Sequence, residues 1–280
     1  MRTCVRAEVL RPRSEKIGTT QRKNPGMNSS ISERKLTRSP SLVTRQRFLW
    51  MGIFSILASS GGVVADLILQ YDPQGNYSLT TPAPLTIALW RVFVGSLLGV
   101  FCIPLAITGY WVVCTVLREA APRLFRVLFW VMAYGIVIGT VFHSTFLAVI
   151  LVEQAAHAAT GAAQASPLHL QNMLLVFSLP LAVFFEVCYL VMWSIVVATV
   201  LRTATRYPRW IVLFVPALLS LVIAGVGQSH VVPVLGNVLY PTVSSLPHLV
   251  FFFFSTLVLW RRTASERKTP HAHPAADTAL

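Results

Sequence analysis

Long apolar segments alternate with polar connections along most of the chain. Six such segments occur, at residues 48–70, 86–117, 127–152, 173–200, 210–227 and 239–260. Each is close to or above the roughly 20 apolar residues that an α-helix needs to cross a bilayer. The pattern predicts an all-α fold: a polytopic bundle of about six transmembrane helices, with the lipid bilayer as its surroundings.

Two segments depart from a simple crossing. Segment 86–117 is longer than one crossing requires, so it is expected to tilt, to bend near Pro104 or to extend beyond the membrane. Segment 210–227 is the shortest of the six and contains Pro216. It is therefore the weakest candidate for a crossing.

Basic residues divide the connections into two classes. The chain before Phe48 holds 12 of the 23 Lys and Arg residues. The connections after the second and fourth segments and the end after the sixth segment are also basic, whereas 71–85, 153–172 and 228–238 contain no Lys or Arg. Because basic connections stay on the cytosolic side, the alternation predicts that both termini are cytosolic.

The polar ends extend this membrane domain. Residues 1–47 are rich in Arg, Ser and Thr and are interpreted as a disordered basic cytosolic tail. Residues 48–260 are interpreted as the transmembrane domain. Residues 261–280 are interpreted as a polar cytosolic tail. The residues near Met1 contain no apolar core, so a secretory signal is not predicted there. An organelle transit peptide and a start at Met27 are alternatives for this tail.

The net charge of +13 resides in tails and connections that flank apolar segments. It is therefore read as a membrane-orientation signal, and no nucleic-acid partner is predicted. The four cysteines show no zinc or disulfide spacing, so no metal site and no cofactor is predicted. The sequence Asn76-Tyr77-Ser78 is a glycosylation sequon in the first outer connection.

Five ionisable residues lie inside the apolar segments, where a charge needs a partner or a wet cavity. They are Asp66, Arg91, His143, Glu186 and His248. From the predicted orientation, Asp66, Arg91 and His143 are expected to form a polar cluster in the outer leaflet, with Glu186 and His248 beneath it. The alternatives are an Asp66–Arg91 ion pair that is only structural and histidines that are satisfied in the interior.

Small residues recur at helical spacing beside these polar positions. Gly95 and Gly99 follow Arg91 at steps of four, and Gly135 and Gly139 precede His143 in the same way. Such faces let helix backbones approach closely. We expect them to pack segments of the bundle together, or to form contacts between copies in a homo-oligomer. Aromatic residues near segment ends, Tyr110 among them, are interpreted as interfacial anchors.

Three functions are compatible with this pattern. A buried acid, base and histidine set fits a carrier of a small solute or a lipid. Two histidines with two carboxylates also fit an intramembrane metal-dependent hydrolase. A non-catalytic scaffold or sensor is the third, and the absence of P-loop, HExxH and Gly-x-Ser-x-Gly motifs favours a protein that is not an enzyme.

Two resemblances accompany these residues. Gly61-Gly62-Val-Val-Ala-Asp66, Trp90-Arg91 and Phe142-His143 resemble the pattern of an uncharacterised family of multipass membrane proteins, which implies no activity. Phe142-His143-Ser144 followed by Glu153 is similar to the seven-helix hydrolases of the alkaline ceramidase and progestin-receptor type. That family's pattern has a Ser where this chain has Gly139 and a second His where it has Phe252.

Overall fold

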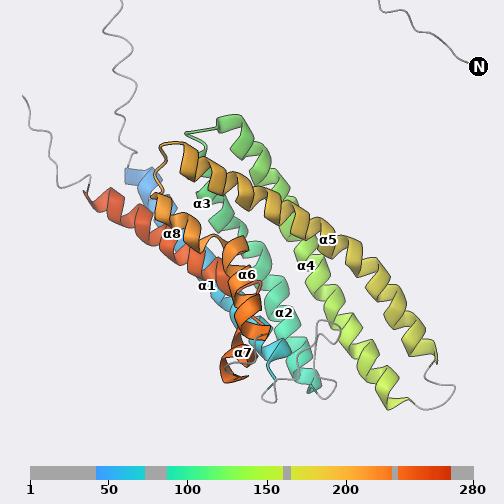
Figure 1. Cartoon of the computed structure of the whole chain (residues 1–280). Helices are drawn as coiled ribbons and strands as arrows, with labels where there is room; N and C mark the ends of the chain where they lie inside the picture. Colours follow the sequence, from blue (N-terminus) through green and yellow to red (C-terminus); the bar gives the residue numbers. More distant parts are fainter. Residues whose placement is uncertain (1–41, 73–86, 160–164, 229–232, 266–280) are drawn as a thin grey trace, which may run out of the picture. The chain divides into compact units, whose positions relative to one another are not determined.

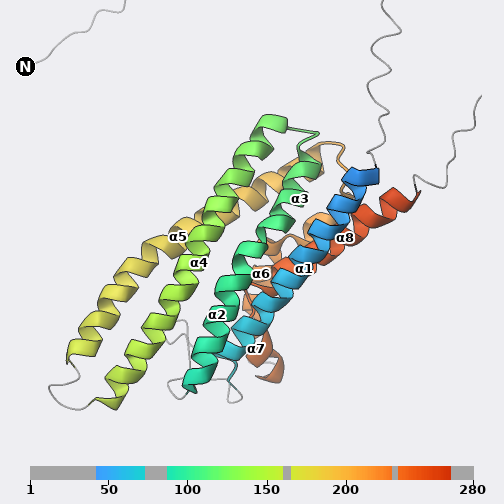
Figure 2. The ribbon, with the colours of Figure 1, turned by 180° about the vertical axis from the view of Figure 1, so that it is seen from behind.

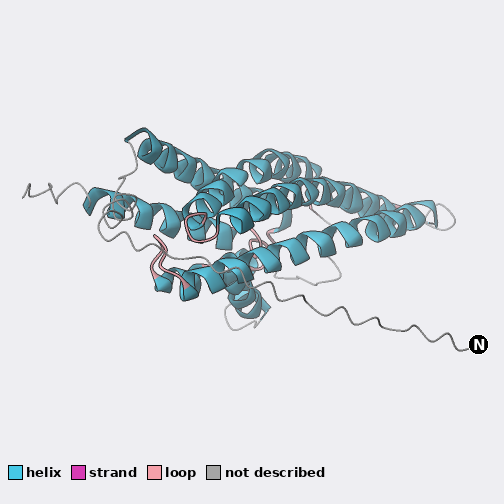
Figure 3. Ribbon diagram, turned by 90° about the horizontal axis from the view of Figure 1, so that it is seen from above, coloured by secondary structure: helices cyan, strands magenta, loops and turns pink. Residues whose placement is uncertain are grey.

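The computed structural model describes residues 42–72, 87–159, 165–228 and 233–265, which all belong to one compact unit. The described secondary structure consists of helices joined by turns, with no strand within these ranges (Figure 3). The predicted all-α class is confirmed. The sequon at Asn76 and most of the two predicted tails lie outside the described residues.

Four stretches of helix are long and apolar enough to cross a membrane. They are Gln46–Gln70, Leu89–Leu117, Pro122–Ala158 and Ser166–Arg202. The first lies in α1 (Leu42–Gln70), which begins ahead of the apolar segment expected to start at Phe48. The last two fill most of α4 (Pro122–Ala158) and α5 (Ala165–Arg202). The protein is therefore an integral membrane protein by the length and composition of these helices.

The second stretch consists of two helices. α2 (Leu89–Leu105) ends one residue after Pro104, and α3 (Ile107–Leu117) begins after Ala106. Proline has no N–H to continue the helical ladder and its ring crowds the preceding turn, so the helix is interrupted there. The bend expected near Pro104 is present.

The two C-terminal segments are more irregular than expected. A 3₁₀-helix, η3 (Arg209–Phe214), precedes α6 (Pro216–Gln228), whose 13 residues span roughly 20 Å. Two further helices follow: α7 (Pro233–Leu239) and, after a turn, α8 (Leu246–Ser265). Since α6 is shorter than the roughly 30 Å hydrocarbon core, the total of six crossings stays a prediction.

The helices form two packed groups. α4 packs mainly against α5, whereas α1 packs against α2 and α8, and α2 also contacts α4 (Figures 1 and 2). The start of α1, the end of α8 and the turns α3–α4 and α5–η3 gather at one end of this bundle (Figure 1). The basic connections identified in the sequence are thus on one end. Which side of the membrane this end faces stays a prediction.

At this end the two basic turns are linked to each other. Arg206 in the α5–η3 turn forms a salt bridge of 2.7 Å with Glu119 in the α3–α4 turn. Nearby, the hydroxyls of Tyr207 and Ser255 are 2.7 Å apart, which connects the α5–η3 turn to α8. These contacts hold α3, α5 and α8 together at the basic end.

The outer faces of the helices carry large apolar side chains. Val176 on α5 is 73% exposed, Trp130 on α4 is 67% exposed and Phe101 on α2 is 69% exposed. A contiguous apolar surface of this kind is unfavourable in water. It is the expected surface of a bundle surrounded by lipid.

The glycine faces predicted from the sequence are occupied within the chain. A Cβ on Gly95 would lie 3.0 Å from the carbonyl oxygen of Ala65, and a Cβ on Gly99 would collide with the His143 imidazole. Gly135 and Gly139 face Phe185 on α5. These faces pack α2 against α1 and α4, and α4 against α5. A homo-oligomer stays a prediction, and it would need another surface.

Candidate functional site

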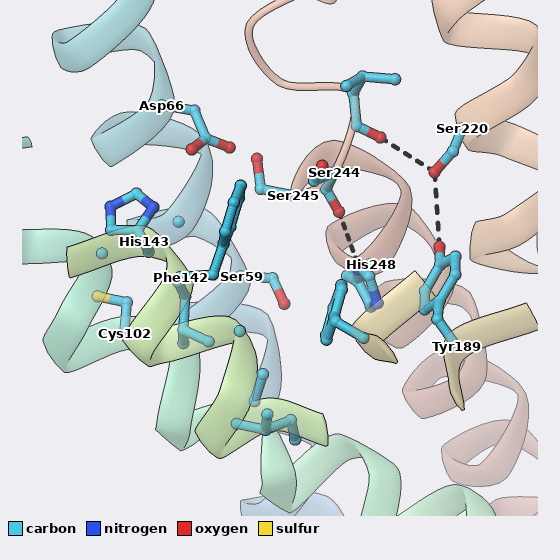
Figure 4. A pocket seen from close by; sticks show the side chains of 18 of the residues that line it. Ser59, Asp66, Cys102, Phe142, His143, Tyr189, Ser220, Ser244, Ser245 and His248 are labelled. Atoms are coloured by element: carbon cyan, nitrogen blue, oxygen red, sulfur yellow. Dashed lines mark hydrogen bonds between the residues drawn. The ribbon is translucent and has the colours of Figure 1, made fainter. Parts of the chain in front are cut away.

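A cavity of about 580 Å³ lies between the two groups of helices. Its lining comes from α1, α2, α3, α4, α5, α6, α8 and the turn that precedes α8. Four of the five predicted intramembrane residues line it: Asp66, His143, Glu186 and His248. The fold therefore brings side chains from α1, α4, α5 and α8 to one space (Figure 4).

Asp66 projects from α1 into this cavity. Its carboxylate points toward the hydroxyl of Ser245, which belongs to the turn before α8 (Figure 4). The Ser245 Oγ is buried, and the Asp66 carboxylate is the group with which it interacts. About two helical turns earlier on α1, Ser59 also lines the cavity, and its Oγ has no hydrogen-bond partner among the described residues. Polar atoms left in this state are normally satisfied by a ligand or by water.

His143 enters the cavity from α4. Its imidazole fits against Gly99 of α2, where any larger residue would occupy the same space. The Nε2 atom is buried without a hydrogen-bond partner in the described part of the chain. The absence of a side chain at Gly99 therefore positions this imidazole beside α2 and the cavity.

His248 is a satisfied interior histidine. Its Nδ1 lies 2.7 Å from the Ser244 carbonyl oxygen, which can only accept, so Nδ1 carries the proton. The Nε2 atom then accepts a hydrogen bond from the Tyr110 hydroxyl at 2.5 Å. Both nitrogens are used, which favours a structural role for this residue over metal binding.

Aromatic rings surround His248 where it lines the cavity. Tyr110, Tyr189, Trp193 and Phe252 have ring centroids 5.4–6.5 Å from the His248 ring. Tyr110 is only 2% exposed, so its interpretation as an interfacial anchor is wrong. Tyr110 follows Pro104 in a segment that is longer than one crossing requires. This position in the sequence could have indicated that its ring lies inside the bundle.

A second hydrogen-bonded group closes the cavity toward α6. The Ser220 hydroxyl donates to the carbonyl oxygen of Val243 at 3.0 Å and lies 3.5 Å from the Tyr189 hydroxyl (Figure 4). These contacts connect α6, the turn before α8 and α5. Sequence reasoning missed Ser220 and Tyr189 because single hydroxyls in apolar helices carry no periodic signal.

Glu186 differs from the other lining residues in its accessibility. It lies on α5, lines the cavity and is exposed, so its carboxylate remains reachable at the cavity's edge. α5 contacts mainly α4, which leaves the face that carries Glu186 free to border the cavity.

Arg91 has a different role from the one predicted. Its guanidinium donates to the carbonyl oxygens of Ile68 at 2.8 Å, Tyr71 at 2.7 Å and Leu67 at 3.5 Å. The last carbonyls of a helix have no partner within that helix, and a cation is favourable there. Arg91 therefore caps the end of α1. It forms no salt bridge with Asp66 in the described part of the chain.

The arrangement offers hydrogen-bond acceptors and carboxylates in an apolar enclosure. Within the described residues, no group of three or more His, Cys, Asp and Glu side chains is placed to hold a metal ion. A hydrolase that uses His143 and His248 as metal ligands lacks support, because both His248 nitrogens have protein partners.

Comparison with known proteins gives one result. No curated protein and no solved structure matches this chain, so nothing supports a relationship to the ceramidase and progestin-receptor hydrolases. Residues 27–262, which include every described helix except the end of α8, match the model of a family of unknown function. The chain belongs to the family of unknown function DUF6796.

Proposed function

We propose that this membrane protein is a carrier that binds a small, largely apolar molecule in the cavity between its helices. The observation that carries the proposal is the cavity itself, with a volume of about 580 Å³. Pockets that hold small molecules commonly measure about 300–1,000 Å³, are mainly apolar and contain a few convergent polar groups. The cavity has this character.

The chemistry of the lining supports binding over simple packing. Apolar side chains such as Ile103, Phe185 and Leu221 form much of the wall. Between them, the Oγ atom of Ser59 and the Nε2 atom of His143 have no protein partner in the described residues. A ligand with an apolar body and a polar group would satisfy these atoms and fill the remaining space.

One interrupted helix and one continuous helix with an internal proline border the cavity, and both support carriage. The break between α2 and α3 follows Pro104, and Cys102, Ile103 and Ala106 at this break line the cavity. α5 contains Pro180 just before the lining residue Ala182. Proline-interrupted helices at a central binding site are a feature of membrane carriers, in which such helices change their arrangement around the site.

The binding step can be tested by filling the cavity. Native mass spectrometry of the protein in lipid nanodiscs should detect a small-molecule adduct on the unaltered chain. Ala224→Phe on α6 places a ring in the cavity and should remove the adduct. Val222→Phe on the same helix is the matched control, because Val222 is 60% exposed and does not line the cavity.

Carriage is tested with the released adduct in protein-containing liposomes. Counterflow should occur with the Val222→Phe protein and be lost with Ala224→Phe. An adduct that persists unchanged in Ala224→Phe would refute binding in this cavity. Binding without counterflow would indicate a receptor and refute the carrier.

A further inference from the structure

We infer that the molecule bound in the cavity carries a positively charged amine, which the carboxylate of Asp66 holds. This inference rests on the proposed function and names the chemical class of its ligand. Among the described residues that line the cavity, two are carboxylic acids, Asp66 and Glu186, and none is Lys or Arg. The cavity can therefore offer negative charge to a ligand, and it has no permanent positive charge to offer.

Among the described residues, Asp66 forms no salt bridge with a Lys, Arg or His side chain. Arg91 is the basic residue nearest to it in the expected cluster, but its donors are directed to the carbonyls of Ile68, Tyr71 and Leu67. A carboxylate inside the membrane domain is costly unless it is paired. A cationic ligand would supply the missing charge, whereas an anionic ligand would increase the cost.

The atoms around Asp66 match the donors of an ammonium group. A primary ammonium has three N–H donors and no acceptor. The Asp66 carboxylate can accept one, and the Oγ of Ser245, which interacts with that carboxylate, can accept a second through its free lone pairs (Figure 4). Ser59 is 5% exposed and its unpartnered Oγ borders the same cavity. Ser59 is two helical turns from Asp66, so its Oγ would contact another part of the ligand and not the ammonium held by Asp66.

The rest of the lining suits the body of such a ligand. The rings of Phe185, Tyr110 and Tyr189 border the cavity. Aromatic faces attract cations as well as apolar groups. The exposed carboxylate of Glu186 lies in the same lining and would attract a cation toward the cavity. We therefore expect an amphipathic amine with an apolar, preferably aromatic, body.

A pair of probes that differ only in charge tests the inference. 2-Naphthylmethylamine and its neutral counterpart 2-naphthalenemethanol are measured by equilibrium dialysis against the protein in detergent micelles. The Ala224→Phe protein in the same micelles corrects for partition into detergent. The unaltered protein should retain the amine at least about tenfold more tightly than the alcohol, as one or more charge-assisted hydrogen bonds would produce.

Variants then assign the preference to Asp66. Asp66→Asn should abolish the preference for the amine while retaining binding of the alcohol, and Asp66→Glu should keep the preference. Glu153→Gln is the control, because Glu153 lies on α4 and does not line the cavity. Ser245→Lys offers a second route, since a lysine there would pair with Asp66 and exclude the amine. It reports on the inference even if Asp66→Asn fails to fold.

The outcomes separate the two proposals. Equal retention of amine and alcohol, with both lost in Ala224→Phe, overturns the cation inference and leaves the proposed function intact. A preference for the amine that survives Asp66→Asn or Ser245→Lys also overturns the inference. If the unaltered protein retains neither probe beyond the Ala224→Phe level, both the inference and cavity binding of such molecules are refuted.

Discussion

Arg91 and Asp66 show how the partner of a single charged side chain decides its role. Arg91 donates to three carbonyls near the end of α1, whereas Asp66 points into the cavity toward Ser245 (Figure 4). A cation at a helix C-terminus satisfies carbonyls that the helix leaves without partners. Arg91 therefore stabilises the fold, and Asp66 is available to a ligand.

Because Arg91 caps α1 and does not pair with Asp66, neutralising Asp66 as well should not restore the stability that is lost when Arg91 is neutralised. Arg91→Met should lower the free energy of unfolding by about 1.5–3 kcal/mol, because hydrogen bonds from a charged donor are lost. Asp66→Asn should not compensate, since it restores no donor to the α1 carbonyls. Unfolding by SDS in mixed micelles would measure the two single variants and the double variant.

A double variant that regains the stability of the unaltered chain would show that Asp66 and Arg91 form an ion pair. Arg91→Lys is the control for charge alone. It should recover only part of the stability, because a lysine cannot reproduce the planar fork that reaches several carbonyls at once.

The contact of α1 with α2 depends on a glycine at the crossing. A Cβ on Gly95 would lie 3.0 Å from the carbonyl oxygen of Ala65 and 3.1 Å from the backbone nitrogen of Leu69. Backbone atoms cannot rotate away as a side chain can. The same crossing brings Arg91 to the end of α1, so the packing of these two helices and the cap are coupled.

Gly95→Ala is therefore expected to destabilise the bundle by about 1–3 kcal/mol, because it overpacks a close helix crossing. Gly225→Ala on α6 is the matched control, since no atom lies within 4 Å of a Cβ there. The control should be neutral or slightly stabilising, because alanine is the better helix former. Thermal unfolding in detergent measures both, and equal effects would contradict the close crossing.

For the whole bundle, the ends of the helices divide the connections into two sets. The start of α1, the end of α8 and the turns α3–α4 and α5–η3 gather at one end (Figure 1). This set carries Arg118, Arg206 and Arg262. The positive-inside rule then predicts that this end faces the cytosol.

Cysteine labelling tests this orientation. Ala204→Cys in the exposed α5–η3 turn should react with a membrane-impermeant maleimide only after the cytosolic side is made accessible. Ala159→Cys, at the C-cap of α4, should react from the opposite side without permeabilisation. The signal of the parent chain is subtracted, and labelling of both positions from one side would refute the topology.

Some of the site could be predicted from single residues and some could not. Asp66, His143 and Glu186 were identified because an ionisable group inside an apolar helix stands out against its neighbours. The structure places them with His248 around one cavity, from which Arg91 is absent, and an outer-leaflet polar cluster stays a prediction. The partners of Arg91 were missed because they depend on how α1 and α2 cross, and the interior position of Tyr110 was missed because it depends on how α3 and α8 pack.

The arrangement of the irregular C-terminal third also could not be predicted from the sequence. Hydropathy detected apolar segments at 210–227 and 239–260, but these contain η3, α6 and parts of α7 and α8, separated by turns. Local breaks at Pro216 and around Pro241 place Ser244 and Ser245 at the cavity. An average over a window of residues cannot register such breaks.

The sequence by itself determines that this is a helical membrane protein, through its apolar segments and the distribution of its basic residues. They also predict its topology, because partition into lipid depends on local composition. Only the tertiary structure decided which polar groups are satisfied and which face the cavity. That distinction depends on the rotation and crossing of helices that are distant in the sequence. It leaves Asp66 facing a cavity, with Arg91 engaged at the end of α1.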